Sequence, residues 1–217
     1  MIKIFKKGKK FLFGFFFAFC LILTGCANKT SISNNPNSCG LAPSTGCQII
    51  TNKSQLNLIS DQIVKLLKNK NFNQLSDFIG PDGLRFSPYS YVNVEQDVIL
   101  NKSDLANILT SNKLYFRGNQ DGSGLPIKLT FKDYFAKYVF DLDFSKAPEK
   151  YANQKFERGN IINNAWDVYK NGYFVEYYFP EVEKKYSGMD RRSLILVFQK
   201  NGSNRYLVGL IHGQRTI

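Results

Sequence analysis

The sequence predicts an α+β domain in which N-terminal helices pack on a curved antiparallel sheet. Three observations indicate this class. Apolar residues between Leu56 and Leu67 recur every three or four positions, as they do on one face of a helix. After Gly83, aromatic and β-branched residues alternate with polar ones, as in strands. The last third of the chain holds two Asn-Gly pairs between apolar runs, a pattern typical of antiparallel hairpins.

The helices are expected in the first half of the domain. The first runs over residues 54–67 and begins at Ser54, whose hydroxyl can cap it. A short second helix over residues 72–79 ends at the glycine-rich turn 80–83. A third short helix begins at Ser103. A fourth covers residues 130–139, where Thr130 and Asp133 resemble a capping box.

The strands are expected from residue 84 onward. Residues 84–94, 98–100 and 113–117 are predicted strands, and 118–124 a plain connecting loop. One hairpin is predicted to join 165–169 to 173–179 through Asn171-Gly172, and another to join 194–199 to 206–211. Because Leu194–Phe198 is apolar on both faces, it is predicted to be a central strand.

An export signal precedes the domain. Five lysines lie between Lys3 and Lys10, and an apolar run over Phe11–Leu23 follows them. This run has the length of a signal sequence and is shorter than the roughly 20 residues of a membrane span. It ends in Leu23-Thr24-Gly25-Cys26, which resembles the bacterial lipobox. The resemblance implies that residues 1–25 are removed and that Cys26 carries lipid, including palmitate. An uncleaved N-terminal anchor is the alternative, and both tether the domain to a membrane.

The residue after the cysteine bears on location. Ala27 is not the aspartate that usually retains lipoproteins at the inner membrane. The resemblance therefore implies the outer membrane in a Gram-negative cell, and otherwise the outer face of the cell membrane.

Residues 26–53 read as a flexible tether, because they are rich in Asn, Ser, Thr, Gly and Pro. Cys39 and Cys47 lie within it, and in an oxidising compartment such a pair is usually a disulfide. The loop it would close is small, so the stabilisation is about 2–3 kcal/mol. A metal site is the alternative, but His212 is the sole histidine and lies far along the chain. A single domain over residues 54–217 follows the tether.

The charge of the chain says little about partners. Removal of residues 1–25, with their five lysines, leaves 192 residues and lowers the net charge from +12 to +7. A basic balance can favour anionic partners, but the remaining lysines are scattered and form no run. We expect no nucleic-acid partner. The expected partners are the membrane, through the N-terminal lipid, and either a small ligand or an envelope protein.

Two family resemblances follow from these segments. Residues 63–78 (IVKLLKNKNFNQLSDF) resemble the first helices of the nuclear transport factor two-like superfamily, whose helices cover a cone-like sheet. Residues 85–89 (RFSPY), 121–124 (DGSG), 188–190 (GMD) and 207–212 (LVGLIH) are similar to landmarks of an uncharacterised family of exported bacterial domains. The second resemblance covers about residues 56–217. Together they imply a fold and no particular activity.

His212 and Asp190 are the candidates for catalysis. A dehydratase or isomerase of the superfamily type would hold a His or Asp inside the cone as acid or base, and Asp190 or Asp167 could be the partner of His212. The alternative is a structural histidine at the end of the last strand. Serine-nucleophile, Cys–His, zinc and dinucleotide motifs are all absent from the sequence, so no cofactor is expected.

Aromatic and arginine side chains are the candidates for binding. Tyr89, Tyr91 and Trp166 could line a pocket or a partner-binding face, and Arg191 could bind carboxylate or phosphate, as could Arg85 and Arg192. Core packing or solvated surface is the alternative for each. The preferred hypothesis is a non-catalytic envelope lipoprotein that binds a ligand or partner. The alternatives are a hydrolase or dehydratase using His212 with a carboxylate, and an envelope assembly factor with an exposed apolar patch.

Overall fold

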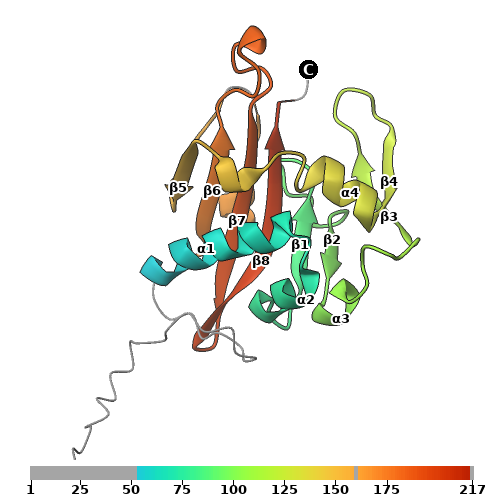
Figure 1. Cartoon of the computed structure of the whole chain (residues 1–217), viewed down its shortest axis with the longest axis vertical. Helices are drawn as coiled ribbons and strands as arrows, with labels where there is room; N and C mark the ends of the chain where they lie inside the picture. The colour runs from blue at the N-terminus through green and yellow to red at the C-terminus, as the bar shows by residue number, and fades with distance from the viewer. Residues whose placement is uncertain (1–52, 159–160, 216–217) are drawn as a thin grey trace, which may run out of the picture. The chain divides into compact units, whose positions relative to one another are not determined.

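The computed structural model describes residues 53–158 and 161–215, and it confirms the predicted α+β class (Figure 1). The main sheet has six strands in the order β2-β1-β8-β7-β6-β5, and β3 and β4 form a separate hairpin. The strands are β1 (Leu84–Ser87), β2 (Val98–Leu100), β3 (Leu114–Asn119), β4 (Pro126–Thr130), β5 (Glu149–Ala152), β6 (Tyr173–Phe179), β7 (Arg192–Asn201) and β8 (Asn204–Gln214). The α-helices are α1 (Lys53–Lys68), α2 (Phe72–Leu75), α3 (Lys102–Leu105), α4 (Phe131–Tyr138) and α5 (Ala165–Val168). Three 3₁₀ turns are η1 (Ser76–Phe78), η2 (Phe144–Lys146) and η3 (Lys184–Tyr186).

Several predictions lie outside these residues. The signal over residues 1–25, the lipid on Cys26 and the Cys39–Cys47 disulfide all fall there and stay predictions. Among the described helices, none is long and apolar enough to cross a membrane.

The predicted helices α1 and α4 are confirmed, and their local causes are visible. The stripe of α1 is buried, with Leu56, Ile63 and Leu67 fully enclosed. At the start of α4 the Thr130 hydroxyl accepts a hydrogen bond from the Asp133 backbone N–H, at 3.2 Å. This cap satisfies one of the donors that every helix N-terminus leaves free.

The main sheet is mixed and not purely antiparallel as predicted. The β7–β8 hairpin is confirmed, and β7 is a central strand between β8 and β6. However, β1 pairs with β8 in parallel, with Phe86 opposite Leu210. A parallel pair needs a long connection, and the chain between Ser87 and Asn204 provides one because it contains most of the other elements.

The other predicted hairpin is wrong. Residues 165–168 form α5, and β6 pairs with β5 and β7 instead. Asn171 has φ 62°, and the Gly172 N–H donates to the Tyr169 carbonyl at 2.9 Å. Asn-Gly therefore serves the left-handed turn after a short helix, a position that favours the same residues as a hairpin turn.

Two further strand predictions need correction. Residues 84–94 were predicted as one strand, but β1 ends at Ser87, immediately before Pro88, which carries no N–H for the ladder. Residues 118–124 were predicted as a loop, but β3 runs on to Asn119 and the turn leads into β4.

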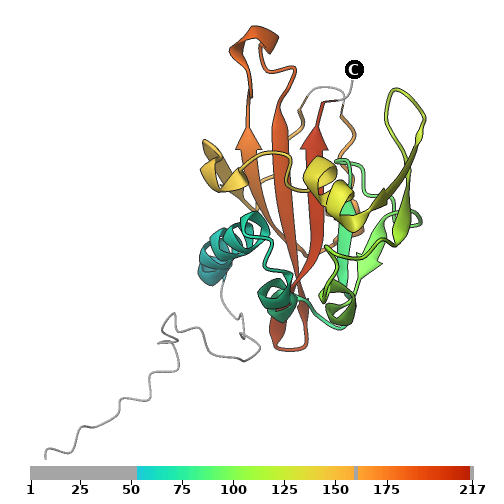
Figure 2. The same cartoon turned by 45° about the vertical axis from the view of Figure 1, so that its right-hand side comes forward.

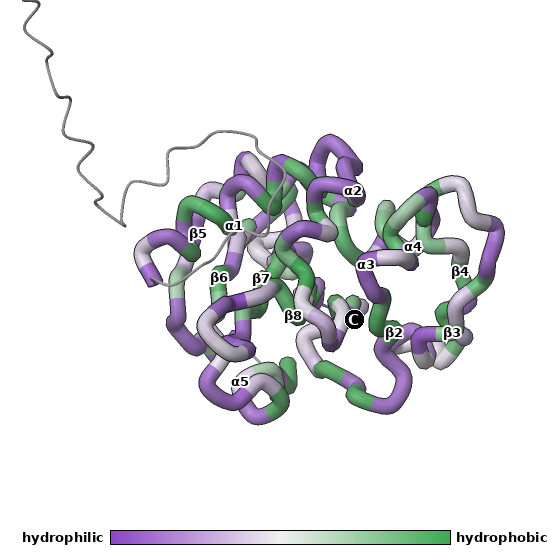
Figure 3. Tube along the Cα trace, turned by 90° about the horizontal axis from the view of Figure 1, so that it is seen from below, coloured by the Kyte–Doolittle hydropathy of each residue, from purple (hydrophilic) through white to green (hydrophobic). Residues whose placement is uncertain are grey.

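The main sheet has two covered faces. The face that packs against α1, α2 and α4, here called the helix face, carries Phe86, Leu194 and Leu196. The opposite face, here called the second face, carries Ile195 and Val197 and packs against Ala165, Trp166 and Tyr169 around α5 and against Val92. Figure 3 shows α5 on the side of β6–β8 away from α1 and α2. The expectation of helices on one face therefore holds for α1, α2 and α4 but not for α5.

Candidate functional site

His212 lies on β8, on the helix face, and its side chain is fully enclosed. Its Nε2 is 2.9 Å from Oδ1 of Asp141, and Oδ2 of the same carboxylate accepts from Nε of Arg192 at 2.9 Å. The edge of the Phe144 ring contacts the imidazole, with ring centres 6.4 Å apart. The predicted pairing of His212 with a carboxylate is thus present, but the carboxylate is Asp141.

The two predicted partners of His212 lie elsewhere. Asp190 accepts the backbone N–H groups of Val182 and Glu183, at 3.2 and 2.7 Å, and so closes the β6–β7 loop. Asp167 belongs to α5 on the second face. Asp141 is 71 positions before His212, in the loop after α4, and no sequence spacing relates the two.

The electrostatics of this cluster favour a structural role. Burial raises the pKa of Asp141, but the hydrogen bonds and charges of His212 and Arg192 outweigh burial and lower it below its usual value. The carboxylate therefore stays ionised and ties the loop after α4 to β7 and β8. No surface of the His212 side chain is exposed, so the imidazole is enclosed in the described part of the chain.

A hollow lies on the second face of the main sheet, where β1 meets the β7–β8 hairpin. Its volume is about 190 Å³, and we call it the Arg85 pocket. Ligand pockets for drug-sized molecules occupy roughly 300–1,000 Å³, so this one suits a ligand of a few heavy atoms or the end group of a larger one. Its lining includes Asp82, Arg85, Ile99, Tyr169, Lys200 and Tyr206.

Cations outnumber carboxylates in the lining of the Arg85 pocket. Asp97, which is not part of the lining, interacts electrostatically with Arg85. Arg85 and Lys200 contribute two cations against the single carboxylate of Asp82, which accepts a hydrogen bond from Asn201 Nδ2 at 3.3 Å. The Arg85 guanidinium is held in place because Nη1 donates to the carbonyl of Val94 at 3.1 Å. A fixed guanidinium loses little conformational freedom when it binds an anion, and its planar donors match carboxylate and phosphate oxygens.

Tyr169 adds a buried donor to this pocket. The side chain is 6% exposed, faces Arg85, and its hydroxyl makes no hydrogen bond of standard geometry to the described residues. Burial raises the pKa of Tyr169 to about 12, so the hydroxyl keeps its proton and can donate. Gly209 makes room for this ring, since a Cβ there would lie 2.9 Å from the hydroxyl oxygen.

Two smaller hollows adjoin one another around Arg158, further along the second face. Their volumes are about 30 and 20 Å³, enough for a water molecule or two. Arg158 stacks on the Tyr178 ring at 3.6 Å and forms an ion pair with the buried carboxylate of Glu176. Arg191 lines one hollow and donates through Nη2 to the Arg158 carbonyl at 2.8 Å. Trp166 lines the other, stacked on Phe174 with ring centres 4.1 Å apart.

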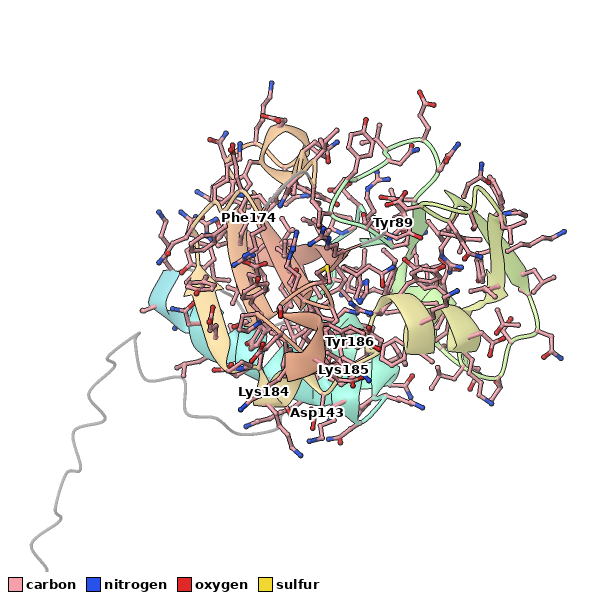
Figure 4. The ribbon with its side chains drawn as sticks, turned by 90° about the horizontal axis from the view of Figure 1, so that it is seen from above. Tyr89, Asp143, Phe174, Lys184, Lys185 and Tyr186 are labelled. Atoms are coloured by element: carbon pink, nitrogen blue, oxygen red, sulfur yellow. The ribbon has the colours of Figure 1, made fainter. Side chains whose placement is uncertain are left out.

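The structure does not gather the four predicted binding residues into one site. Trp166 and Arg191 line adjoining hollows. Tyr89 lies between the main sheet and the hairpin, apart from Phe174, as Figure 4 shows. The Tyr89 hydroxyl accepts from the Asp121 N–H at 3.1 Å, and its ring contacts Tyr138. Tyr91 is 53% exposed.

Sequence reasoning noted Arg85 but missed Tyr169, Lys200 and Tyr206. The available signal was the cluster of turn residues at 80–83 and 201–202, which brings two chain reversals to one end of the sheet. Within the described residues, no group of three or more His, Cys, Asp or Glu side chains is arranged to hold a metal ion.

Comparison with known proteins identifies no relatives. No family model, no curated protein sequence and no solved structure matches this chain.

Proposed function

We propose that this chain is an envelope lipoprotein, anchored by lipid on Cys26, whose domain is a non-catalytic module that binds a small anionic ligand. The Arg85 pocket carries the proposal, because two cations and a buried tyrosine hydroxyl beside Arg85 line the largest hollow described above. A carboxylate or phosphate group suits this set of donors, since charge-assisted hydrogen bonds are the strong ones.

The histidine–carboxylate pair of the catalytic alternative is not part of the pocket lining. His212 and Asp141 lie on the helix face, away from this lining, and contact each other, while Asp141 also accepts from Arg192. A relation to the nuclear transport factor two-like fold is part of the same proposal. It is supported by α1, α2 and α4 on one face of the sheet.

A ligand screen tests the proposed pocket. The full-length chain in detergent is heated with a panel of small carboxylates and phosphomonoesters, and the midpoint of unfolding is measured. At least one compound should raise the midpoint for the wild type and not for Arg85→Met, which removes the guanidinium and keeps most of the stem. At a ligand concentration about 100 times Kd, the stabilisation is about 2.7 kcal/mol.

Lys184→Met is the control for this screen, because Lys184 is an exposed cation in η3, away from the pocket lining. It should respond as the wild type does. Equal midpoint shifts in Arg85→Met and wild type, for every active compound, would contradict the assignment of the pocket.

The lipid anchor is tested separately. Cys26→Ser should abolish incorporation of labelled palmitate and leave unprocessed precursor, because the thiol is the acceptor that the lipobox resemblance implies. Continued labelling of the variant would rule out Cys26 as the lipidated residue.

An assembly factor is the second candidate, and one observation favours it. Leu114, Phe116 and Leu125, around the β3–β4 hairpin, are between 51% and 59% exposed. Clusters of large exposed apolar residues often mark protein contacts. In that case a photo-crosslinker at position 116 would capture one envelope protein in cells, and Leu114→Ser would reduce the yield.

A further inference from the structure

Arg117, on β3, is the most unusual buried side chain in the described part of the chain. It is 2% exposed, and none of its three guanidinium nitrogens has a hydrogen-bond partner there. Buried polar groups in proteins are nearly always hydrogen-bonded, so an unpaired, enclosed guanidinium needs an explanation.

Neighbouring aromatic rings account for the charge of Arg117 but not for its donors. The guanidinium carbon lies 3.8 Å from the centre of the Tyr134 ring and 4.8 Å from that of Tyr115. The faces of these rings stabilise a cation. The N–H bonds point outward in the guanidinium plane, however, and a ring stacked on that plane leaves them unmet.

Asp97 is a buried carboxylate near Arg117. Asp97 Oδ2 accepts from the Ser87 hydroxyl at 2.5 Å and from the Asn93 N–H at 3.1 Å. It is close enough to Arg117 to interact electrostatically, but no ion pair joins them. The donors of Arg117 therefore have no hydrogen-bond partner among the described residues, although a carboxylate lies near them.

Tyr134 brings a further donor from a different element. It lies on α4, is fully buried, and its hydroxyl also has no partner among the described residues. Burial raises its pKa well above the usual value, so the hydroxyl keeps its proton. Unpaired donors from β3 and α4 therefore lie close together. Figure 2 shows α4 and the β3–β4 hairpin next to each other at one side of the main sheet.

An irregularity in the β3 backbone accompanies the inward direction of the Arg117 side chain. The β3–β4 register shifts between Phe116 and Asn119, so Arg117 and Gly118 lie in a β-bulge. Gly118 has φ 77°, a left-handed conformation that glycine adopts without strain and other residues adopt rarely. Bulges of this kind commonly redirect side chains next to binding sites.

We propose that Arg117 and Tyr134 form an internal site for one small free oxyanion of the phosphate or sulfate class, separate from the Arg85 pocket. A tetrahedral oxyanion offers several acceptors to in-plane guanidinium donors and to a tyrosine hydroxyl. Because the site is enclosed, it suits a free ion and not a group carried on a polymer. Because Arg117 and Tyr134 are both enclosed, the ion would have to enter by local opening of the hairpin, which shares no strand pairing with the main sheet.

Equilibrium dialysis with radiolabelled inorganic phosphate tests the site. The full-length chain in detergent carries Arg85→Met in all samples, so that the Arg85 pocket does not contribute. This chain should retain phosphate at a saturable stoichiometry near one. Adding Arg117→Met should weaken retention by about tenfold or more, as expected for loss of a charge-assisted bidentate contact. Unlabelled sulfate should compete, and chloride at equal ionic strength should not.

A milder variant covers the case in which Arg117→Met fails to fold. Tyr134→Phe deletes only the unpaired hydroxyl and keeps the ring beneath the guanidinium, so it should fold and weaken phosphate binding several-fold. Absence of saturable binding in the Arg85→Met chain would overturn the proposal. So would equal binding in the Arg117→Met or Tyr134→Phe chain.

Discussion

At the scale of single residues, the sequence identifies candidate side chains better than it identifies their partners. His212 stood out as the sole histidine, but Asp141 could not be matched to it, because 71 positions and a change of element separate them. Tyr169 was assigned to a strand, and its place in the pocket depends on the left-handed turn at Asn171. The buried Arg117 had no sequence signal, because arginine in a short hairpin normally faces water.

The Asp141 cluster predicts a pH dependence of stability. The folded pKa of Asp141 lies below its unfolded value, so the ionised carboxylate stabilises the fold above the unfolded pKa. That stabilisation is lost as pH falls through the folded pKa, below about pH 4. In Asp141→Asn, the free energy of unfolding at pH 7 should fall by about 3 kcal/mol, because Arg192 is left without its anion.

Denaturant unfolding from pH 7 down to pH 3 checks this prediction. The wild type should lose more stability at acid pH than Asp141→Asn does, so the two curves converge. Parallel curves would mean that the ionised form of Asp141 does not stabilise the fold. Asp77→Asn, at an exposed position, is the matched control. Its free energy of unfolding should depend on pH as that of the wild type does.

At the scale of elements, periodicity and capping residues correctly predicted those helices and strands whose formation depends on interactions within one segment. The stripe of α1, the cap of α4 and the β7–β8 hairpin all follow from residues within one segment. The hairpin prediction at Asn171-Gly172 was wrong because the same pair suits a turn after a helix, and here Trp166 of that helix stacks on Phe174. The short β5 was missed because its pairing with β6 is a tertiary contact.

Loss of the α4 cap should have a measurable cost. Thr130→Ala removes the side-chain acceptor for the Asp133 N–H, and the free energy of unfolding should fall by about 1 kcal/mol. Chemical denaturation measures the change. Lys132→Ala, an exposed position in the same first turn, is the control and should change stability by much less. Equal effects of the two substitutions would show that the cap contributes nothing.

At the scale of the whole molecule, the α+β class followed from the order of helical and strand patterns, but the arrangement of the two faces did not. The parallel placement of β1 beside β8 brings Arg85 level with Gly209, and so next to Tyr169. Both the Arg85 pocket and the Arg158 hollows depend on this second face. No pattern within one segment encodes that juxtaposition, because it results from how distant segments pair.

Native mass spectrometry tests the central claim, a ligand in the Arg85 pocket, most directly. Wild-type chain and Arg85→Met chain would be extracted gently from the host envelope in the same detergent and compared. The wild type should carry a small anionic molecule whose added mass is absent from Arg85→Met and present in the Lys184→Met control. The same added mass on wild type and Arg85→Met, or a bare mass on both, would contradict the account.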